Sequence, residues 1–184
     1  MSTSAVSVAI TYTIDTAHSH AQFKVRHMMI ANVRGEFSTV TGTVQFDESN
    51  PSAAMVRVIL DTSTVNTGDE QRDQHLKSSD FFDVARYPKI TFESTAVTAA
   101  GPGSYVIAGD LTIRDATRPV VLRVQELTAE QKDPWGNLRR GANAKTKINR
   151  KDFGLEWNLA LEAGGFLVGD EIDITLDVEL IRQS

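Results

Sequence analysis

The feature that most limits the folds open to this chain is a period-two alternation of apolar and polar residues, which recurs along much of its 184 residues. The clearest case lies near the C-terminus, where Ile172, Ile174, Leu176, Val178 and Leu180 alternate with polar or acidic residues. Successive side chains of a β-strand point to opposite faces, so this pattern indicates a strand with one buried face. The chain is therefore expected to be built mainly from half-buried strands.

Comparable strand patterns follow one another at short spacing. They include AQFKVRH, AMVRVILD, PKITFEST, YVIAGDLTIR, VVLRVQEL and GANAKTKI, with turn-forming stretches such as DESNP, AAGPGS and KDPWGN between some of them. About eight strands joined by short connections, without alternating helices, favour an antiparallel meander. Because closure removes both sheet edges, we predict an all-β fold, an eight-stranded antiparallel barrel whose interior holds packed side chains or one small ligand.

The main interruption of the strand pattern is EQRDQHLKSSDFF at residues 70–82. Thr67 and Glu70 match the spacing of a capping box, which predicts a short helix with Thr67 as its N-cap and an end near Ser78. Asp73 and His75 would diverge on that helix, so they cannot form an acid–base pair with each other. We interpret the segment as a lid over the barrel mouth. Its apolar anchors are Leu76, Phe81 and Phe82.

Composition and charge exclude several classes of function. The chain has 24 acidic and 19 basic residues with no basic run, so we expect no nucleic-acid partner. The absence of cysteine excludes disulfides, thiol nucleophiles and thiolate metal sites. We find neither a signal-peptide core nor a membrane span, and we expect a cytoplasmic protein. We expect a single domain over residues 12–184, after a disordered or loosely attached segment at residues 1–11.

The sequence HSH at positions 18–20 offers the most plausible alternative chemistry. In an extended segment His18 and His20 would share one face at a spacing that can bind zinc or copper, so a metal-dependent enzyme using these two residues stays open as an alternative. Nothing resembles the strained turn that exposes a catalytic serine. We therefore predict no metal site, no cofactor and no catalytic residue.

Several segments together resemble the YceI-like family, described as lipocalin-like, polyisoprenoid-binding proteins. They are YTIDTAHSHAQFKVRH, RGEFSTVTGTVQFD, NTGDEQRDQHLKSSDFFDVARYPKITFEST, GDLTIRDATRPVVL and INRKDFGLEWN. The resemblance spans roughly Tyr12 to Leu180, and it implies a lipocalin-like barrel around a long apolar pocket that holds an isoprenoid or other lipid-like molecule. The family's motifs fall on His18, Ser19, Phe23, Arg72, Asp73, His75, Leu76, Phe81, Phe82, Asp152, Phe153 and Gly154.

Two departures from the family's pattern bear on that pocket. The turn after the LTI strand reads Arg114-Asp115-Ala116-Thr117 instead of a His-Gly-Val-Thr-like turn. Gly141 and Ala142 stand where a Gly-Phe pair is common. The missing aromatic side chain predicts a wider or reshaped cavity at that point.

Combining the strand faces with the resemblance, we expect a binding or carrier protein, not an enzyme, that sequesters a polyprenyl chain, an isoprenoid quinone or a similar molecule. A homodimer is left open. A stress-related interaction protein with a filled barrel is a further alternative. The residues expected to line the cavity are Phe23, Val25, Phe37, Val44, Phe92, Leu111, Ile113, Leu122 and Ile174. His18, Arg72 or His75 is expected near the polar end of the ligand.

Overall fold

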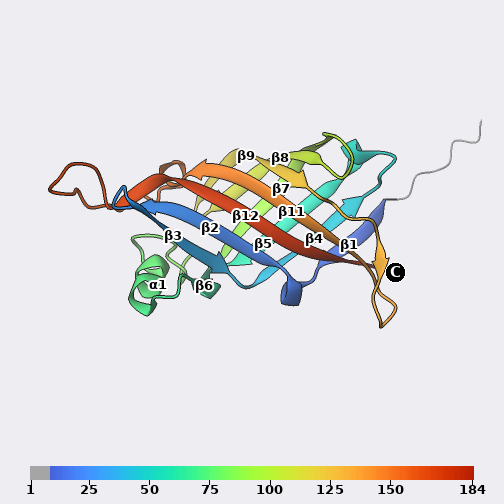
Figure 1. The fold of residues 1–184 in the computed structure, drawn as a ribbon, viewed down its shortest axis with the longest axis horizontal. Helices are drawn as coiled ribbons and strands as arrows, with labels where there is room; N and C mark the ends of the chain where they lie inside the picture. The colour runs from blue at the N-terminus through green and yellow to red at the C-terminus, as the bar shows by residue number, and fades with distance from the viewer. Residues whose placement is uncertain (1–8) are drawn as a thin grey trace, which may run out of the picture.

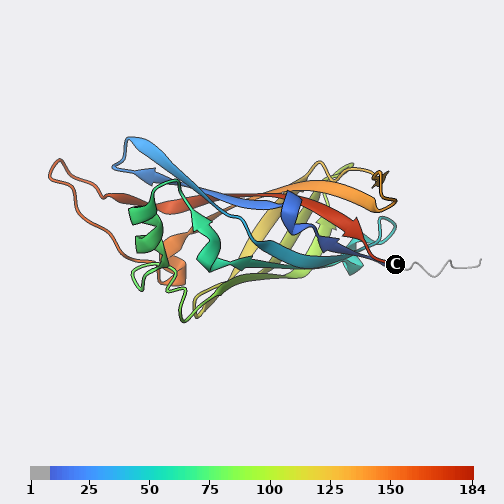
Figure 2. The same ribbon diagram turned by 90° about the horizontal axis from the view of Figure 1, so that it is seen from below.

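The computed structural model describes residues 9–184 as an elongated β-barrel with one α-helix at one end (Figures 1 and 2). The strands are β1 (Ile10–Ile14), β2 (His20–His27), β3 (Ala31–Phe37), β4 (Val40–Phe46), β5 (Met55–Asp61), β6 (Val65–Asn66), β7 (Lys89–Ala99), β8 (Tyr105–Ile113), β9 (Ala116–Gln125), β10 (Gln131–Lys132), β11 (Leu138–Asn149) and β12 (Val168–Arg182). The helices are α1 (Glu70–Lys77) and the 3-10 turns η1 (Thr16–His18), η2 (Pro51–Ala53), η3 (Thr62–Thr64) and η4 (Arg150–Phe153).

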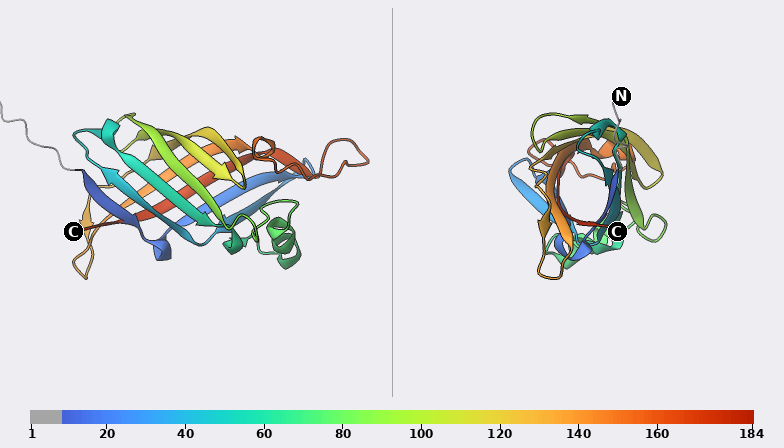
Figure 3. Two further views of the ribbon diagram at one scale, coloured as in Figure 1. Left: turned by 180° about the vertical axis from the view of Figure 1, so that it is seen from behind. Right: turned by 90° about the vertical axis from the view of Figure 1, so that its right-hand side faces the viewer.

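Eight strands form the closed ring. Their order is β11-β9-β8-β7-β5-β4-β1-β12, and β12 pairs with β11 over most of its length to complete the circle. Every pairing within this ring is antiparallel, and the end-on view in Figure 3 shows the strands surrounding one interior. The predicted all-β, eight-stranded antiparallel barrel with a short helix is confirmed.

Several strands of the wall are short, but they lie end to end in pairs, so the barrel is longer than any one of them. β1 and β2 pair with the same strand β12, since Ile14 lies opposite Leu180 and His20 lies opposite Asp177. β3 extends β4 in the same way, with β2 and β1 as their respective partners. The wall formed by β2, β3 and β6 therefore continues past the ring toward the end where α1 lies (Figure 1).

Hydroxyl side chains join the wall where these strands are interrupted. The Thr16 hydroxyl donates to the Val40 carbonyl at 2.8 Å, and the Thr62 hydroxyl donates to the Tyr87 carbonyl at 2.8 Å. The Ser19 hydroxyl, which is fully buried, accepts a hydrogen bond from the Glu179 amide. Because buried backbone groups need partners, these side chains replace ladder bonds that the interruptions remove.

The helix α1 begins two residues later than the capping-box pattern predicts. The Asp69 carboxylate accepts the Arg72 amide at 2.9 Å and is the N-cap, so the assignment of Thr67 as N-cap was wrong. The Thr67 hydroxyl donates instead to the Asp73 carboxylate at 2.6 Å. The predicted end of the helix is correct, since Ser78 is its C-cap.

At the N-terminus, β1 includes Ile10 and Thr11, which pair with Phe46 and Gln45 of β4. These two residues therefore belong to the barrel and not to the loosely attached segment that was expected up to residue 11; the expectation for residues 1–8 lies outside the described residues. Within residues 9–184, no helix has the length and apolar character needed to cross a bilayer.

Candidate binding cavities in the barrel

The barrel interior holds a first apolar cavity of about 130 Å³ beneath the lid. Leu76, Phe81 and Phe82 cover it from the α1 side, and Leu155 and Val168 cover it from the segment between η4 and β12. Its other lining residues are Ala21, Gln22, Phe23, Phe37, Val58, Leu60, Ile90, Phe92, Leu111, Ile113, Val120, Leu122, Thr146, Ile148, Arg150, Ile172, Ile174 and Leu176. With so few polar side chains in its wall, this cavity suits an apolar group.

A second apolar cavity of about 90 Å³ lies in the same interior. Val58, Leu122 and Leu176 line both cavities and therefore form the partition between them. The other residues around the second cavity are Tyr12, Ile14, Val44, Phe46, Ala54, Val56, Val97, Tyr105, Ile107, Val124, Leu127, Arg140, Ala142, Ala144, Val178 and Leu180. The interior thus holds two neighbouring apolar cavities that share these three wall residues.

The structure places the apolar residues predicted from the sequence in two different spaces. Those that line the first cavity are Phe23, Phe37, Phe92, Leu111, Ile113, Leu122 and Ile174. Val44 lines the second cavity. Val25 lines neither, although its partner in the strand register, Ile172, lines the first cavity.

Arg72 and His75 lie outside both cavities, so neither is at a polar end of the lined space. The Arg72 guanidinium donates to the Thr67 hydroxyl at 2.7 Å and to the Thr67 carbonyl, because the side chain folds back over the start of α1. His75 belongs to the lid itself, and its ring centroid lies 4.5 Å from that of Trp157 and 5.1 Å from that of Phe81. Both residues stabilise the lid and do not contact the cavity.

Two further hydrogen bonds hold the lid in place. The Arg114 guanidinium, at the departure from the family's turn, donates to the Phe81 carbonyl at 3.2 Å and lies over the Tyr87 ring. The changed turn therefore contacts the lid. The hydrogen bond between the His75 imidazole and the Asp80 carboxylate, 2.8 Å long, closes the helix onto the residues that follow it.

Arg150 is the one charged residue in the wall of the first cavity, and sequence reasoning did not single it out. Its guanidinium donates to the carbonyls of Gly169, Leu155 and Trp157 at 2.8, 2.5 and 2.9 Å. Burial lowers the pKa of this guanidinium. Since its strong hydrogen bonds are to backbone carbonyls, Arg150 holds the segment between η4 and β12 against the barrel. Its place in INRKDFG, two residues before Asp152, was the available signal.

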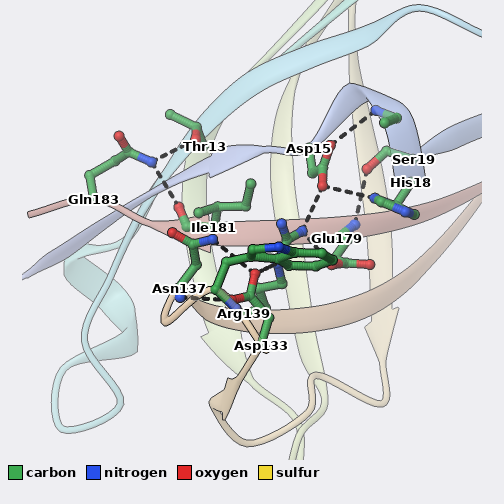
Figure 4. Close-up of polar contacts among 12 residues, drawn as sticks. Thr13, Asp15, His18, Ser19, Asp133, Asn137, Arg139, Glu179, Ile181 and Gln183 are labelled. Carbon is green, nitrogen blue, oxygen red and sulfur yellow. Dashed lines mark hydrogen bonds and ion pairs between the residues drawn. The ribbon is translucent and has the colours of Figure 1, made fainter.

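His18 lies on the outer surface, in the cluster shown in Figure 4, and not in either cavity. Residues 16–18 form the turn η1 instead of the expected extended segment, and the group of possible metal ligands around His18 consists of Asp15 and Glu179, without His20. The His18 imidazole contacts the Asp15 carboxylate at 2.9 Å, which raises the pKa of His18. Hydrogen bonds from His18 and Arg139 lower the pKa of Asp15.

The atoms of Asp15, His18 and Glu179 lie close enough to bind one metal ion, but Arg139 lies among them. Its Nη1 atom is 2.6 Å from the Asp15 carboxylate and 2.6 Å from that of Glu179. Burial alone would raise the pKa of Asp133, but hydrogen bonds from Asn137 and Arg139 outweigh it and lower that pKa. Because the guanidinium already balances these carboxylates, we interpret the cluster as an ion-pair network.

Comparisons with known proteins agree with this architecture. The family model of the YceI-like domain matches residues 12–180. Protein YceI of Escherichia coli is 38% identical over 179 residues, covering 96% of this chain and 90% of that protein. The crystal structure of BcnA from Burkholderia cenocepacia superposes with a TM-score of 0.76 at 22% identity, over 90% of this chain and 98% of that chain.

A polyisoprenoid binding domain from Saccharophagus degradans superposes with a TM-score of 0.69 at 15% identity, over 96% of this chain and 99% of that chain. At such identities the two solved structures show a shared fold. The family match over residues 12–180 and the E. coli relative carry the assignment. The chain therefore belongs to the YceI-like family.

Proposed function

We propose that this protein binds a long apolar chain of the isoprenoid or a similar lipid type inside its barrel, without catalysing a reaction on it. The observation that carries the proposal is the pair of apolar cavities, which share the partition of Val58, Leu122 and Leu176. The fold shared with a domain described as polyisoprenoid binding supports it. Membership in the YceI-like family supports it as well.

The cavity volumes say how such a ligand must fit. A dry apolar cavity of about 150 Å³ holds a molecule the size of benzene, so spaces of about 130 and 90 Å³ each hold only a small part of a chain. A longer chain would need the side chains of Val58, Leu122 and Leu176 to move aside. Each buried methylene contributes about 0.8 kcal/mol, so a chain of many carbons can offset this rearrangement and the association cost.

Extraction of the protein purified from its native host, followed by mass spectrometry, tests the proposal. We expect a long apolar molecule at about one per chain or per dimer, with a loss of that molecule in Ala144→Phe, which would fill the second cavity. Ala96→Phe on the exposed face of β7 is the control. A clean extract, together with no uptake of added isoprenoid quinones or lipids, would contradict the proposal and point to a filled barrel.

The proposal extends to two expectations carried over from the sequence, a cytoplasmic location and a homodimer. Fractionation of the native host tests the first of them. Light scattering of the purified chain tests the second, and a mass of one chain at all concentrations would contradict it.

A further inference from the structure

Arg140 differs from every other side chain around the second cavity because it is charged. It lies near the start of β11, at the end of the barrel where the C-terminus lies, while α1 lies at the other end (Figure 1). Its side chain is only 10% exposed. The rings of Tyr12 and Phe46 each lie 5.8 Å from its guanidinium carbon. A guanidinium is therefore enclosed by aromatic and aliphatic groups.

Most of the hydrogen-bonding capacity of this guanidinium is unused. Its Nη2 atom donates to the Glu48 carboxylate. Its Nε and Nη1 atoms are buried and have no hydrogen-bond partner among residues 9–184. These two nitrogens carry three of the five N–H donors of an arginine. Aromatic ring faces attract a cation but are poor substitutes for an oxygen acceptor, so the group lacks acceptors.

The charge around Arg140 is already balanced. Glu48 pairs with Arg140, and Glu130 pairs with Arg182 at 3.2 Å while accepting the Tyr12 hydroxyl at 2.6 Å. Two carboxylates thus face two guanidinium groups. A further anion would add a negative charge beside both carboxylates, whereas an uncharged oxygen would accept the free N–H groups without that repulsion.

The position of Arg140 suits the end of a chain-like ligand. Arg140, Ala142 and Val178 line both the second cavity and an open depression on the outer surface. This wall therefore separates the apolar interior from solvent. Ala142 is its smallest side chain.

We propose that Arg140 binds an uncharged carbonyl oxygen, such as that of an amide, ester or ketone, at the head of an apolar chain that runs from the second cavity toward the lid. This inference rests on the proposed binding of an apolar chain and adds the chemistry of the head group and the direction of the ligand.

Three ligands of equal chain length separate the two proposals: hexadecane, hexadecanamide and hexadecanoate, each measured by displacement of an apolar fluorescent probe. Arg140→Met keeps an unbranched apolar side chain at this position and removes the N–H donors. We expect it to weaken hexadecanamide about tenfold, as for a lost hydrogen bond to a charged group, and to leave hexadecane unchanged. Arg57→Met is the control, because Arg57 is 59% exposed and pairs with Glu93 on the outer face.

A second variant keeps Arg140 and tests the charge balance. Glu48→Gln removes the carboxylate that pairs with Nη2, so hexadecanoate should gain affinity by a larger factor than hexadecanamide. Thermal unfolding by circular dichroism confirms that each variant is folded.

The possible failures are distinct. If hexadecane and hexadecanamide respond alike to Arg140→Met, or if Glu48→Gln does not favour hexadecanoate, the head-group assignment is wrong while binding of an apolar chain stands. If the wild-type protein binds none of the three ligands, the proposed function fails and this inference fails with it.

Discussion

Two glycines shape the barrel wall at the scale of single residues. A Cβ atom built on Gly35 would lie 2.4 Å from the Phe23 ring, and one built on Gly109 would lie 2.4 Å from the Phe92 ring. Each aromatic ring therefore packs closely against the glycine of a neighbouring strand. Since both rings line the first cavity, these glycines influence the size of that cavity.

Gly109→Ala should destabilise the protein, because the new methyl group would also lie 2.5 Å from the Glu93 carbonyl oxygen. Overpacking of this kind costs about 1–3 kcal/mol. Urea unfolding measures the change in the free energy of unfolding. Gly141→Ala is the matched control, since its nearest neighbour would lie at an ordinary 3.7 Å; equal stability of the two variants would contradict this account.

His18→Ala should reduce stability in a pH-dependent way. The folded-state pKa of His18 lies above its usual 6.5 because of Asp15, so the stabilisation is fully present below pH 6.5 and is lost as pH rises through the folded-state pKa. The partner Asp15 has a lowered pKa, so its contribution is present above its usual 3.8 and is lost in stronger acid.

Urea unfolding at about pH 6 and about pH 9 checks this expectation. The wild-type protein should exceed His18→Ala in stability at the lower pH, and the difference should shrink at the higher pH. His20→Ala, on an exposed histidine outside the ion-pair network, is the control. A stability difference that grows with pH would be inconsistent with a raised pKa of His18 in the folded protein.

At the scale of elements, the lid depends on how one short helix begins. An eight-residue helix is marginal by itself, so its cap and its tertiary contacts decide whether it forms. The Asp69 carboxylate caps the first turn, and Asp73 ties the helix back to Thr67. Leu76 is the residue of α1 that lines the first cavity.

Asp69→Ala should loosen the lid, because loss of an N-cap costs about 1 kcal/mol. If the lid opens locally, that cost corresponds to about fivefold faster amide exchange in α1, which hydrogen exchange measures. Gln71→Ala, on an exposed position of the same helix, should have little effect. Equal exchange in the two variants would show that tertiary contacts, and not the cap, limit opening.

At the scale of the whole molecule, the partition divides the barrel interior along its length. Leu122 on β9 and Leu176 on β12 contribute to it from strands that are both neighbours of β11 in the ring, and Val58 contributes from β5. A barrel of eight strands leaves little interior space, so a few side chains are enough to divide it. Ligand length is therefore expected to depend on these three residues.

Leu122→Ala should join the two cavities, with a loss of about 2–5 kcal/mol in stability and a gain in affinity for long apolar chains. Leu111→Ala is the matched control. Leu111 is 8% exposed and Leu122 is 6% exposed, but Leu111 lines only the first cavity, whereas Leu122 lines both. Binding of chains of increasing length distinguishes the variants, and equal length preference in both would contradict the role of the partition.

The sequence by itself determined the antiparallel barrel and, for all the predicted lining residues except Val25, a position on the wall of one of the two cavities. Phe92 and Leu111 could be assigned to the interior because parity along a strand is a local property. The end of α1 at Ser78 was also predictable. Its start was not, because Thr67 and Asp69 are both good caps and a contact with Asp73 takes up the threonine.

Only the tertiary structure decided how far along the barrel each inward residue lies. The register between strands distant in sequence places Val44 in the second cavity and Phe23 in the first. The alternation along a strand shows which face a residue is on, but not how far along the barrel it lies. The same register brings Asp15 to Arg139 and leaves Arg140 partly unpaired beside Phe46. The ion-pair partner of a charged side chain depends on which strands lie beside it, and the closure of the ring decides that arrangement.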